Sequence, residues 1–263
     1  MMKKFLLVLC VVFALFASLF LTTNCTDKKQ DVAFATDSIK YNKVEKASKV
    51  NFVADYPTQG NPALVQIVRE WISEEMGGFY KGSYDKGDSL VDFYGSAAMD
   101  TMRVFLKEIE PGMQQESQMN IRKKYETNKF VTYEASSYSY YGGAHGGATL
   151  EGATFRKTDG RKFGWDIFKL ESRFSKVQEL IKAGLKQYFK VKTDDELKDN
   201  LLSPDQIYVL PLPQAAPYFT KEGVKFVYAQ YEIACYAAGM PTFTVPYDKI
   251  KDALTVPAAA LIE

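Results

Sequence analysis

One histidine, His145, occurs in the chain of 263 residues, and it lies in the glycine-rich run 142–147. A single histidine excludes zinc sites that need two, such as H-E-x-x-H. The sequence also contains no G-x-S-x-G, P-loop or dinucleotide-binding motif. A serine or Cys235 nucleophile beside His145 stays open, because catalytic triads are defined by geometry and not by spacing. We therefore expect a protein that is not an enzyme, with no catalytic residues, no metal and no other cofactor.

Tyrosines precede this histidine on a stretch that alternates like a strand. Alternate residues of a strand share a face, so Tyr133 and Tyr141 lie on one face and Tyr138 and Tyr140 on the other. One pair is expected in the core. The other is expected on the surface, where tyrosine with serine is typical of adaptable binding sites, and tyrosine is also a usual platform for sugar rings. The candidate binding residues are Tyr140, Tyr141 and His145, against the simpler interpretation of sheet packing and a structural glycine connection.

A cysteine and several acidic residues are further candidates for catalysis. Cys235 lies among small apolar residues without a basic neighbour, so we expect it to be a buried small hydrophobe and unreactive. Glu232 and the acidic run 194–196 are possible glycosidase acids, which leaves an envelope polysaccharide hydrolase as the alternative function. The acidic run also suits the first turn of a helix, and the separation of the carboxylates decides between these interpretations.

The N-terminus has the pattern of a secretory signal. Lys3 and Lys4 precede an apolar run, 5–21, and the sequence turns polar and charged after Cys25. We predict a signal peptide over 1–24, lipidation of Cys25 and a tether over 25–36. Asn24 departs from the small residue that usually precedes a lipidated cysteine, and cleavage without lipid or an uncleaved anchor are the alternatives. The expected location is the bacterial cell envelope, membrane-anchored and facing the periplasm or the cell exterior.

Charge and length limit the partners. The chain has 33 basic and 32 acidic residues, a net charge of +1. Binding to nucleic acid needs a strongly basic face, so we expect no nucleic-acid partner. The residues after the tether are enough for one or two hydrophobic cores.

Hydrophobic periodicity and turn residues predict an α+β fold, with an antiparallel sheet meander, helices packed on it and two sequential subdomains, 37–147 and 148–255. Asn61 and Pro62 have the pattern of a helix start, and Thr193 and Glu196 that of a capping box. We expect helices over 62–76, 89–111 and 172–190, a short helix after 193, a helical turn near 247, and strands at 39–41, 50–52, 119–125, 130–141, 148–157, 207–210, 224–231 and 242–245.

Two passages resemble known bacterial domains. They comprise 140–146 (Tyr-Tyr-Gly-Gly-Ala-His-Gly) with 154–155 and 158–162, and 223–226 with 231–239 (Tyr-Glu-Ile-Ala-Cys-Tyr-Ala-Ala-Gly) and 245–247. The chain is similar to the paired domains of unknown function 4163 and 3298, the first over 37–147 and the second over 148–255. That pair forms the extracytoplasmic half of the anti-sigma-V factor RsiV, a lysozyme receptor, and occurs in related lipoproteins. The resemblance implies a binding or sensing module for a protein or a cell-wall glycan. A purely structural envelope component is a third hypothesis.

Overall fold

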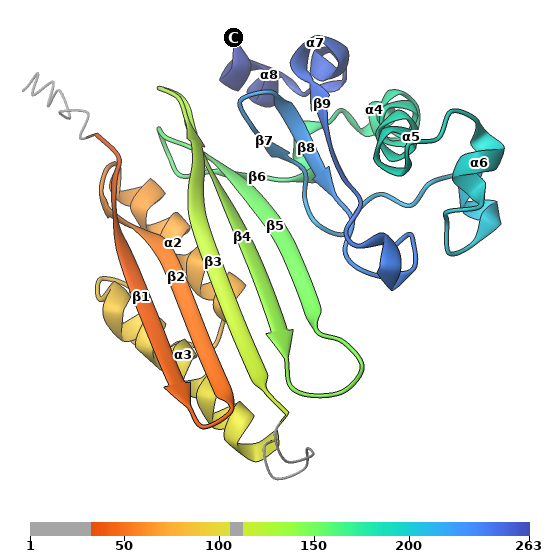
Figure 1. Ribbon diagram of the computed structural model, residues 1–263. Helices are drawn as coiled ribbons and strands as arrows, with labels where there is room; N and C mark the ends of the chain where they lie inside the picture. The colour runs from red at the N-terminus through yellow and green to blue at the C-terminus, as the bar shows by residue number, and fades with distance from the viewer. Residues whose placement is uncertain (1–32, 106–112) are drawn as a thin grey trace, which may run out of the picture. The chain divides into compact units, whose positions relative to one another are not determined.

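The computed structural model describes residues 33–105 and 113–263, which build two β-sheets with helices around them (Figure 1). β1 (Ala35–Glu45) and β2 (Ser48–Gln59) form an antiparallel hairpin. Alternate residues of β2 are buried, from Ser48 to Tyr56, so one face of the hairpin belongs to the core. The two short strands predicted here are confirmed, and both are longer than the alternating residues indicated.

α2 (Pro62–Met76) begins where the sequence predicts. The Asn61 side-chain oxygen accepts hydrogen bonds from the backbone N–H groups of Ala63 at 2.9 Å and Leu64 at 3.4 Å, which satisfies two donors of the first turn. Gly77, at φ 136°, ends the helix. α3 (Gly87–Phe105) starts two residues before the predicted position, and the rest of the predicted helix, 106–111, lies outside the described residues.

The sheet continues with β3 (Gln115–Glu126), β4 (Phe130–Tyr140), β5 (Gly147–Arg156) and β6 (Lys162–Phe163). β3, β4 and β5 form the predicted antiparallel meander, and β6 adds a short fourth strand that was not predicted. β2 and β3 pair in parallel, in contrast to the predicted antiparallel sheet. The reason is that α2 and α3, which follow β2, return the chain to the end of the sheet at which β2 begins, and β3 starts there. The strand order is β1 to β6, so one sheet holds strands from both predicted ranges, 37–147 and 148–255.

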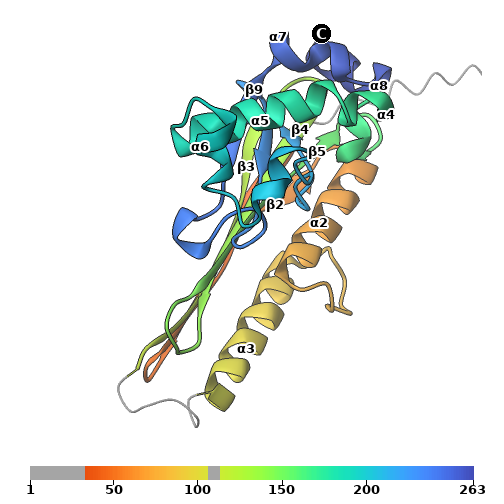
Figure 2. The same cartoon turned by 90° about the vertical axis from the view of Figure 1, so that its right-hand side faces the viewer.

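α2 and α3 cover one face of this sheet (Figure 2). Trp71 of α2 packs edge-on against Tyr133 and Phe155, with ring centroids 6.1 and 5.8 Å apart. These side chains are at most 4% exposed, so the helix-facing side of the sheet is a closed aromatic core at this point. The helix predicted over 62–76 from hydrophobic periodicity is therefore confirmed, and its apolar stripe, Leu64, Val68, Trp71 and Ile72, is buried.

The C-terminal part contains a three-stranded antiparallel sheet and short helices. Its elements are η1 (Trp165–Ile167), α4 (Leu170–Arg173), α5 (Lys176–Phe189), α6 (Asp194–Lys198), η2 (Pro204–Ile207), β7 (Tyr218–Phe219), β8 (Gly223–Val227), η3 (Tyr236–Ala238), β9 (Thr242–Pro246), α7 (Tyr247–Ile250), η4 (Lys251–Ala253) and α8 (Val256–Ile262). Thr193 and Glu196 form the predicted capping box at α6. The α+β class predicted from the sequence is confirmed.

This part meets the face of the large sheet opposite the helices. Tyr218 Oη and Lys225 Nζ each donate to Glu134 at 2.6 Å, and Phe219 N donates to Thr154 Oγ1 at 2.9 Å. Burial opposes ionisation of Glu134, but the hydrogen bonds from Lys225 and Tyr218 hold its pKa below the usual value. The contact between the two sheets therefore combines directional polar bonds with apolar packing, since the rings of Phe130 in β4 and Phe219 in β7 lie 5.7 Å apart.

Three predictions for the C-terminal part are wrong. Residues 207–210 are not a strand, because Pro204 and Pro211 flank them and η2 occupies 204–207. The strand predicted over 224–231 stops at Val227, where the chain leaves the sheet. The helix predicted over 172–190 is split into α4 and α5, and Phe174, at the break between them, is 72% exposed. Within the described ranges, no helix has the length and apolar character needed to cross a membrane.

Candidate functional site

The two sequence passages that carry the family resemblance come into contact. The His145 ring from the glycine-rich loop stacks on the Tyr236 ring, with centroids 3.9 Å apart and an interplanar angle of 23°. Tyr236 Oη donates to the carbonyl oxygen of Gly146 at 2.9 Å. The Tyr231 ring lies 5.7 Å from Tyr236 and 6.4 Å from His145. We call these three side chains, His145, Tyr231 and Tyr236, the aromatic stack.

Hydrogen bonds fix the loop that carries the two tyrosines. Glu232 accepts from the backbone N–H of Gln214 at 2.6 Å and of Ala229 at 2.7 Å. Gln230 Oε1 accepts from Ala148 N of β5 at 2.9 Å, which ties the loop to the large sheet. Tyr231 has a φ of 62° and is 54% exposed. A left-handed conformation is unusual for an aromatic residue, and it is held here by the surrounding bonds.

Gly146 connects the aromatic stack to β4. A Cβ atom on Gly146 would lie 2.6 Å from the Tyr138 ring, so this ring packs directly on the glycine backbone. No larger residue fits there without moving the tyrosine. Tyr138 therefore adjoins the stack on one side, and on the other side it lines a cavity.

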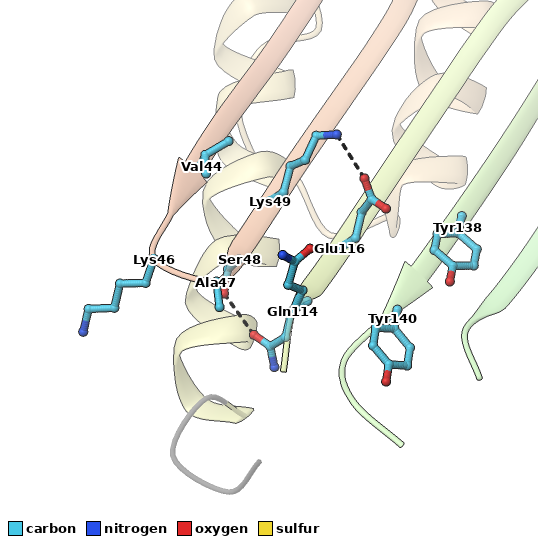
Figure 3. Close-up of a pocket in the computed structure, with 10 residues that line it drawn as sticks. Val44, Lys46, Ala47, Ser48, Lys49, Gln114, Glu116, Tyr138 and Tyr140 are labelled. Atoms are coloured by element: carbon cyan, nitrogen blue, oxygen red, sulfur yellow. Dashed lines mark hydrogen bonds and ion pairs between the residues drawn. The ribbon is translucent and has the colours of Figure 1, made fainter. Parts of the chain in front are cut away.

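This cavity lies at the end of the large sheet, on the face opposite the helices (Figure 3). It has a volume of about 530 Å³ and is lined by the β1–β2 turn, the start of β3 and the end of β4. Tyr138 and Tyr140 lie side by side on the β4 side of it, and Lys49 and Glu116 lie on the β2 and β3 side. The volume is within the range of roughly 300–1,000 Å³ that is common for ligand sites.

A buried hydrogen-bond chain orders the base of the cavity. Ser48 Oγ donates to Gln115 Oε1 at 3.0 Å, and Gln115 Nε2 donates to the Tyr141 carbonyl at 3.2 Å. Ser48 and Gln115 are each 1% exposed. Because buried polar groups need their partners, this chain holds the three lining segments in one arrangement.

The structure separates the three residues predicted as the binding site. Tyr140 lies in the cavity, and its hydroxyl donates to the Gly143 carbonyl at 2.9 Å. Tyr141 lies on the helix side of the sheet, where its ring is 5.5 Å from that of Phe105. His145 belongs to the aromatic stack and is exposed. Tyr140 and His145 thus flank Tyr138, whereas Tyr141 faces away from them; the predicted lipidation site, Cys25, lies outside the described residues.

The groups weighed for catalysis have other partners. Glu232 caps its own loop, Asp194 forms ion pairs with Lys182 at 3.0 Å and Lys186 at 2.6 Å, and Glu196 completes the capping box of α6. Over residues 33–105 and 113–263, no three His, Cys, Asp or Glu side chains gather as a metal site would require.

The prediction that Cys235 is buried is wrong. Ile233 and Ala234 fill the core, and the chain then turns into η3, so that Cys235 is exposed. Its apolar neighbours in the sequence led to the expectation that Cys235 is buried with them. The chain turns at this residue, and the Cys235 side chain therefore points to the surface.

Sequence reasoning missed Glu75, a half-buried carboxyl group near the end of α2. Burial, with a further contribution from Glu151, raises its pKa to about 7. A signal was present, because Glu75 follows Val68 by seven residues and so continues the apolar stripe of the helix. It lies on the helix side of the sheet and is no part of the cavity.

The fold and the site thus define an α+β protein with an open aromatic and polar surface. Residues 165–248, from η1 into α7, match the family described as "Protein of unknown function (DUF3298)". A comparison with curated proteins gives no match.

Two solved structures share the fold. A member of the DUF3298 family from Bacteroides fragilis NCTC 9343 has a TM-score of 0.72 and 22% identity, with 88% of this chain and 98% of that chain covered. A DUF3298 family protein from Pseudomonas aeruginosa PAO1 has a TM-score of 0.57 and 19% identity, with 86% and 95% covered. At these identities the likeness establishes the fold alone.

Proposed function

We propose that this chain is a lipid-anchored binding or sensing module of the bacterial envelope, which recognises a protein or a cell-wall glycan without cleaving it. The observation that carries the proposal is the continuity of the cavity and the aromatic stack, which Tyr138 joins into one open surface. Loops on a rigid sheet commonly carry recognition, and tyrosine supplies contact area at low entropic cost.

The alternative, a polysaccharide hydrolase, has less support. Such an enzyme needs two facing carboxyl groups, one with a raised pKa. The cavity is lined by one carboxylate, Glu116, and hydrogen bonds from Gln118 and Lys49 hold its pKa below the usual value. A carboxylate of this kind is a poor general acid. The resemblance of the chain to domain 4163 and to the extracytoplasmic half of RsiV, a lysozyme receptor, is the reason that a protein is one of the two ligand classes.

Ligand capture from an envelope extract of the producing bacterium tests the proposal. The full-length protein, Tyr140→Ala and His145→Ala are compared, each first shown by circular dichroism to be folded. We expect both variants to retain at least tenfold less ligand. Tyr208→Ala, which removes a tyrosine that is 78% exposed directly after η2, is the matched control and should bind like the parent. Equal capture by all four proteins would place the site elsewhere, and release of cleaved glycan would contradict a binding-only role.

A further inference from the structure

A row of uncharged amide side chains crosses the large sheet next to the cavity. The strand register aligns Asn42 of β1 with Asn51 of β2, Asn51 with Gln118 of β3, and Gln118 with Tyr138 of β4. Directly aligned residues share a face, and this face is the one opposite α2 and α3. Asn42, Gln118 and Tyr138 are exposed, and Asn51 is half-buried. We call Asn42, Asn51 and Gln118 the amide row, which Tyr138 continues on β4.

Three cations on this face lie next to carboxylates. Lys49 pairs with Glu116 at 3.2 Å, and Arg122 pairs with Asp55 at 2.8 Å. Lys124 lies 3.6 Å from Glu134. Since each of these three cations has a carboxylate partner, these six side chains offer little attraction to an ionic ligand.

A ligand at the row can contact side chains but cannot pair with the backbone of β2, β3 or β4, because these strands lie inside the sheet. β2, β3 and β4 are each hydrogen-bonded to a strand on both sides, so an extended peptide cannot add to the sheet at Asn51, Gln118 or Tyr138. Protein interfaces are usually centred on a desolvated apolar or aromatic anchor with a polar rim. Here the centre of the surface is polar and the aromatic rings lie to one side of it.

We infer that the amide row, with Tyr138 and Tyr140, binds a neutral glycan chain, an inference that rests on the proposed binding function and names its ligand class. An amide group both donates and accepts hydrogen bonds without charge, which suits sugar hydroxyl and acetamido groups. The C–H face of a hexose ring packs on a tyrosine ring, and Tyr138 and Tyr140 provide two such rings two residues apart on one strand. Four strands at about 4.8 Å span roughly 14 Å, which is long enough for more than one sugar ring.

The test is titration calorimetry of the full-length protein, purified in a detergent without a sugar headgroup. The probes are the β-1,4-linked hexamers of N-acetylglucosamine and of glucose, which separate acetylated from plain chains, and an anionic hexauronate. We expect at least one neutral hexamer to bind, with a Kd that changes less than twofold between 50 and 500 mM salt and with weaker or no binding of the hexauronate. Gln118→Ala and Tyr138→Ala should each weaken binding at least tenfold.

Two matched controls distinguish a loss of binding at the proposed site from a general effect of removing an exposed amide or tyrosine. Asn128→Ala removes an exposed amide from the β3–β4 turn, and Tyr208→Ala removes an exposed tyrosine that follows η2. Both should leave the Kd unchanged. Failure of both neutral hexamers to bind, a preference for the hexauronate, or unchanged binding by folded Gln118→Ala and Tyr138→Ala would each overturn the glycan inference. If the hexamers fail while Tyr140-dependent capture from the envelope extract persists, the inference falls and the proposed binding function stands.

Discussion

Glu75 makes the stability of this protein depend on pH in a direction that can be calculated. Its carboxyl group is half-buried near the end of α2, and burial together with Glu151 raises its pKa from 4.5 to about 7. The folded protein therefore holds a proton on Glu75 between pH 4.5 and 7, whereas the unfolded chain has lost it. Because the unfolded state binds fewer protons in this window, the free energy of unfolding falls as the pH rises through it.

The size of the effect follows from the shift. One pKa unit corresponds to about 1.36 kcal/mol. Raising the pKa of Glu75 from 4.5 to about 7 therefore destabilises the folded state by about 3 kcal/mol above pH 7. Below pH 4.5 both states are protonated and this cost is absent. Partial contact of the carboxyl group with water reduces the expected value to about 2–3 kcal/mol.

Glu75→Gln removes the titrating group and keeps its shape. We expect the variant to match the parent at pH 4 and to exceed its unfolding free energy by about 2–3 kcal/mol at pH 8. Urea unfolding followed by tryptophan fluorescence measures this, since Trp71 and Trp165 lie in the two cores. Glu179→Gln is the matched control, because Glu179 is a carboxyl group of α5 whose side chain is 73% exposed. A difference between Glu75→Gln and the parent that is the same at pH 4 and pH 8 would refute the assignment.

Three further predictions concern the core, the contact between the sheets and the anchor. Trp71→Ala should lower the unfolding free energy by about 3–5 kcal/mol in urea titrations, because it empties a buried site, whereas Phe174→Ala, at an exposed position, should change it by less than about 0.5 kcal/mol. Equal effects of the two would contradict the placement of these rings. Gly152→Ala puts a Cβ 2.4 Å from the Tyr218 ring and should cost about 1–3 kcal/mol in the same assay; an unchanged midpoint would mean that Tyr218 does not pack there. Mass spectrometry should find the mature chain starting at a lipidated Cys25, and any other start, or an unmodified cysteine, would contradict the anchor.

Local signals in the sequence determined the parts of the fold that depend on neighbouring residues. Asn61 and Pro62 fixed the start of α2, and the Thr193–Glu196 capping box fixed that of α6, because a helix end is satisfied by groups within three or four residues. The antiparallel strands β3, β4 and β5 were likewise predictable, since each alternates apolar and polar residues and neighbours its partner in the chain.

The candidate site was predictable only in part. The sequence singled out Tyr140 and His145, and the alternation of the strand already placed Tyr141 on the opposite face from Tyr140. It did not indicate that Tyr236 stacks on His145, because these residues are 91 positions apart and meet through the contact between the two sheets. The exposure of Cys235 and Phe174 also escaped the sequence pattern, because breaks in the chain direction there change which side faces the core.

The alignment of the amide row across the strands is visible only in the tertiary structure. Asn51 and Gln118 are neighbours because β2 and β3 pair in parallel, and two helices separate these strands in the chain. No turn residue sets that register; it follows from the packing of α2 and α3 on the sheet, which includes the buried Trp71. The sequence by itself thus specified the starts of α2 and α6, the antiparallel strands β3 to β5 and the tyrosine-bearing strand among them. The packing of distant segments brought the amides, the tyrosines and the histidine onto one surface.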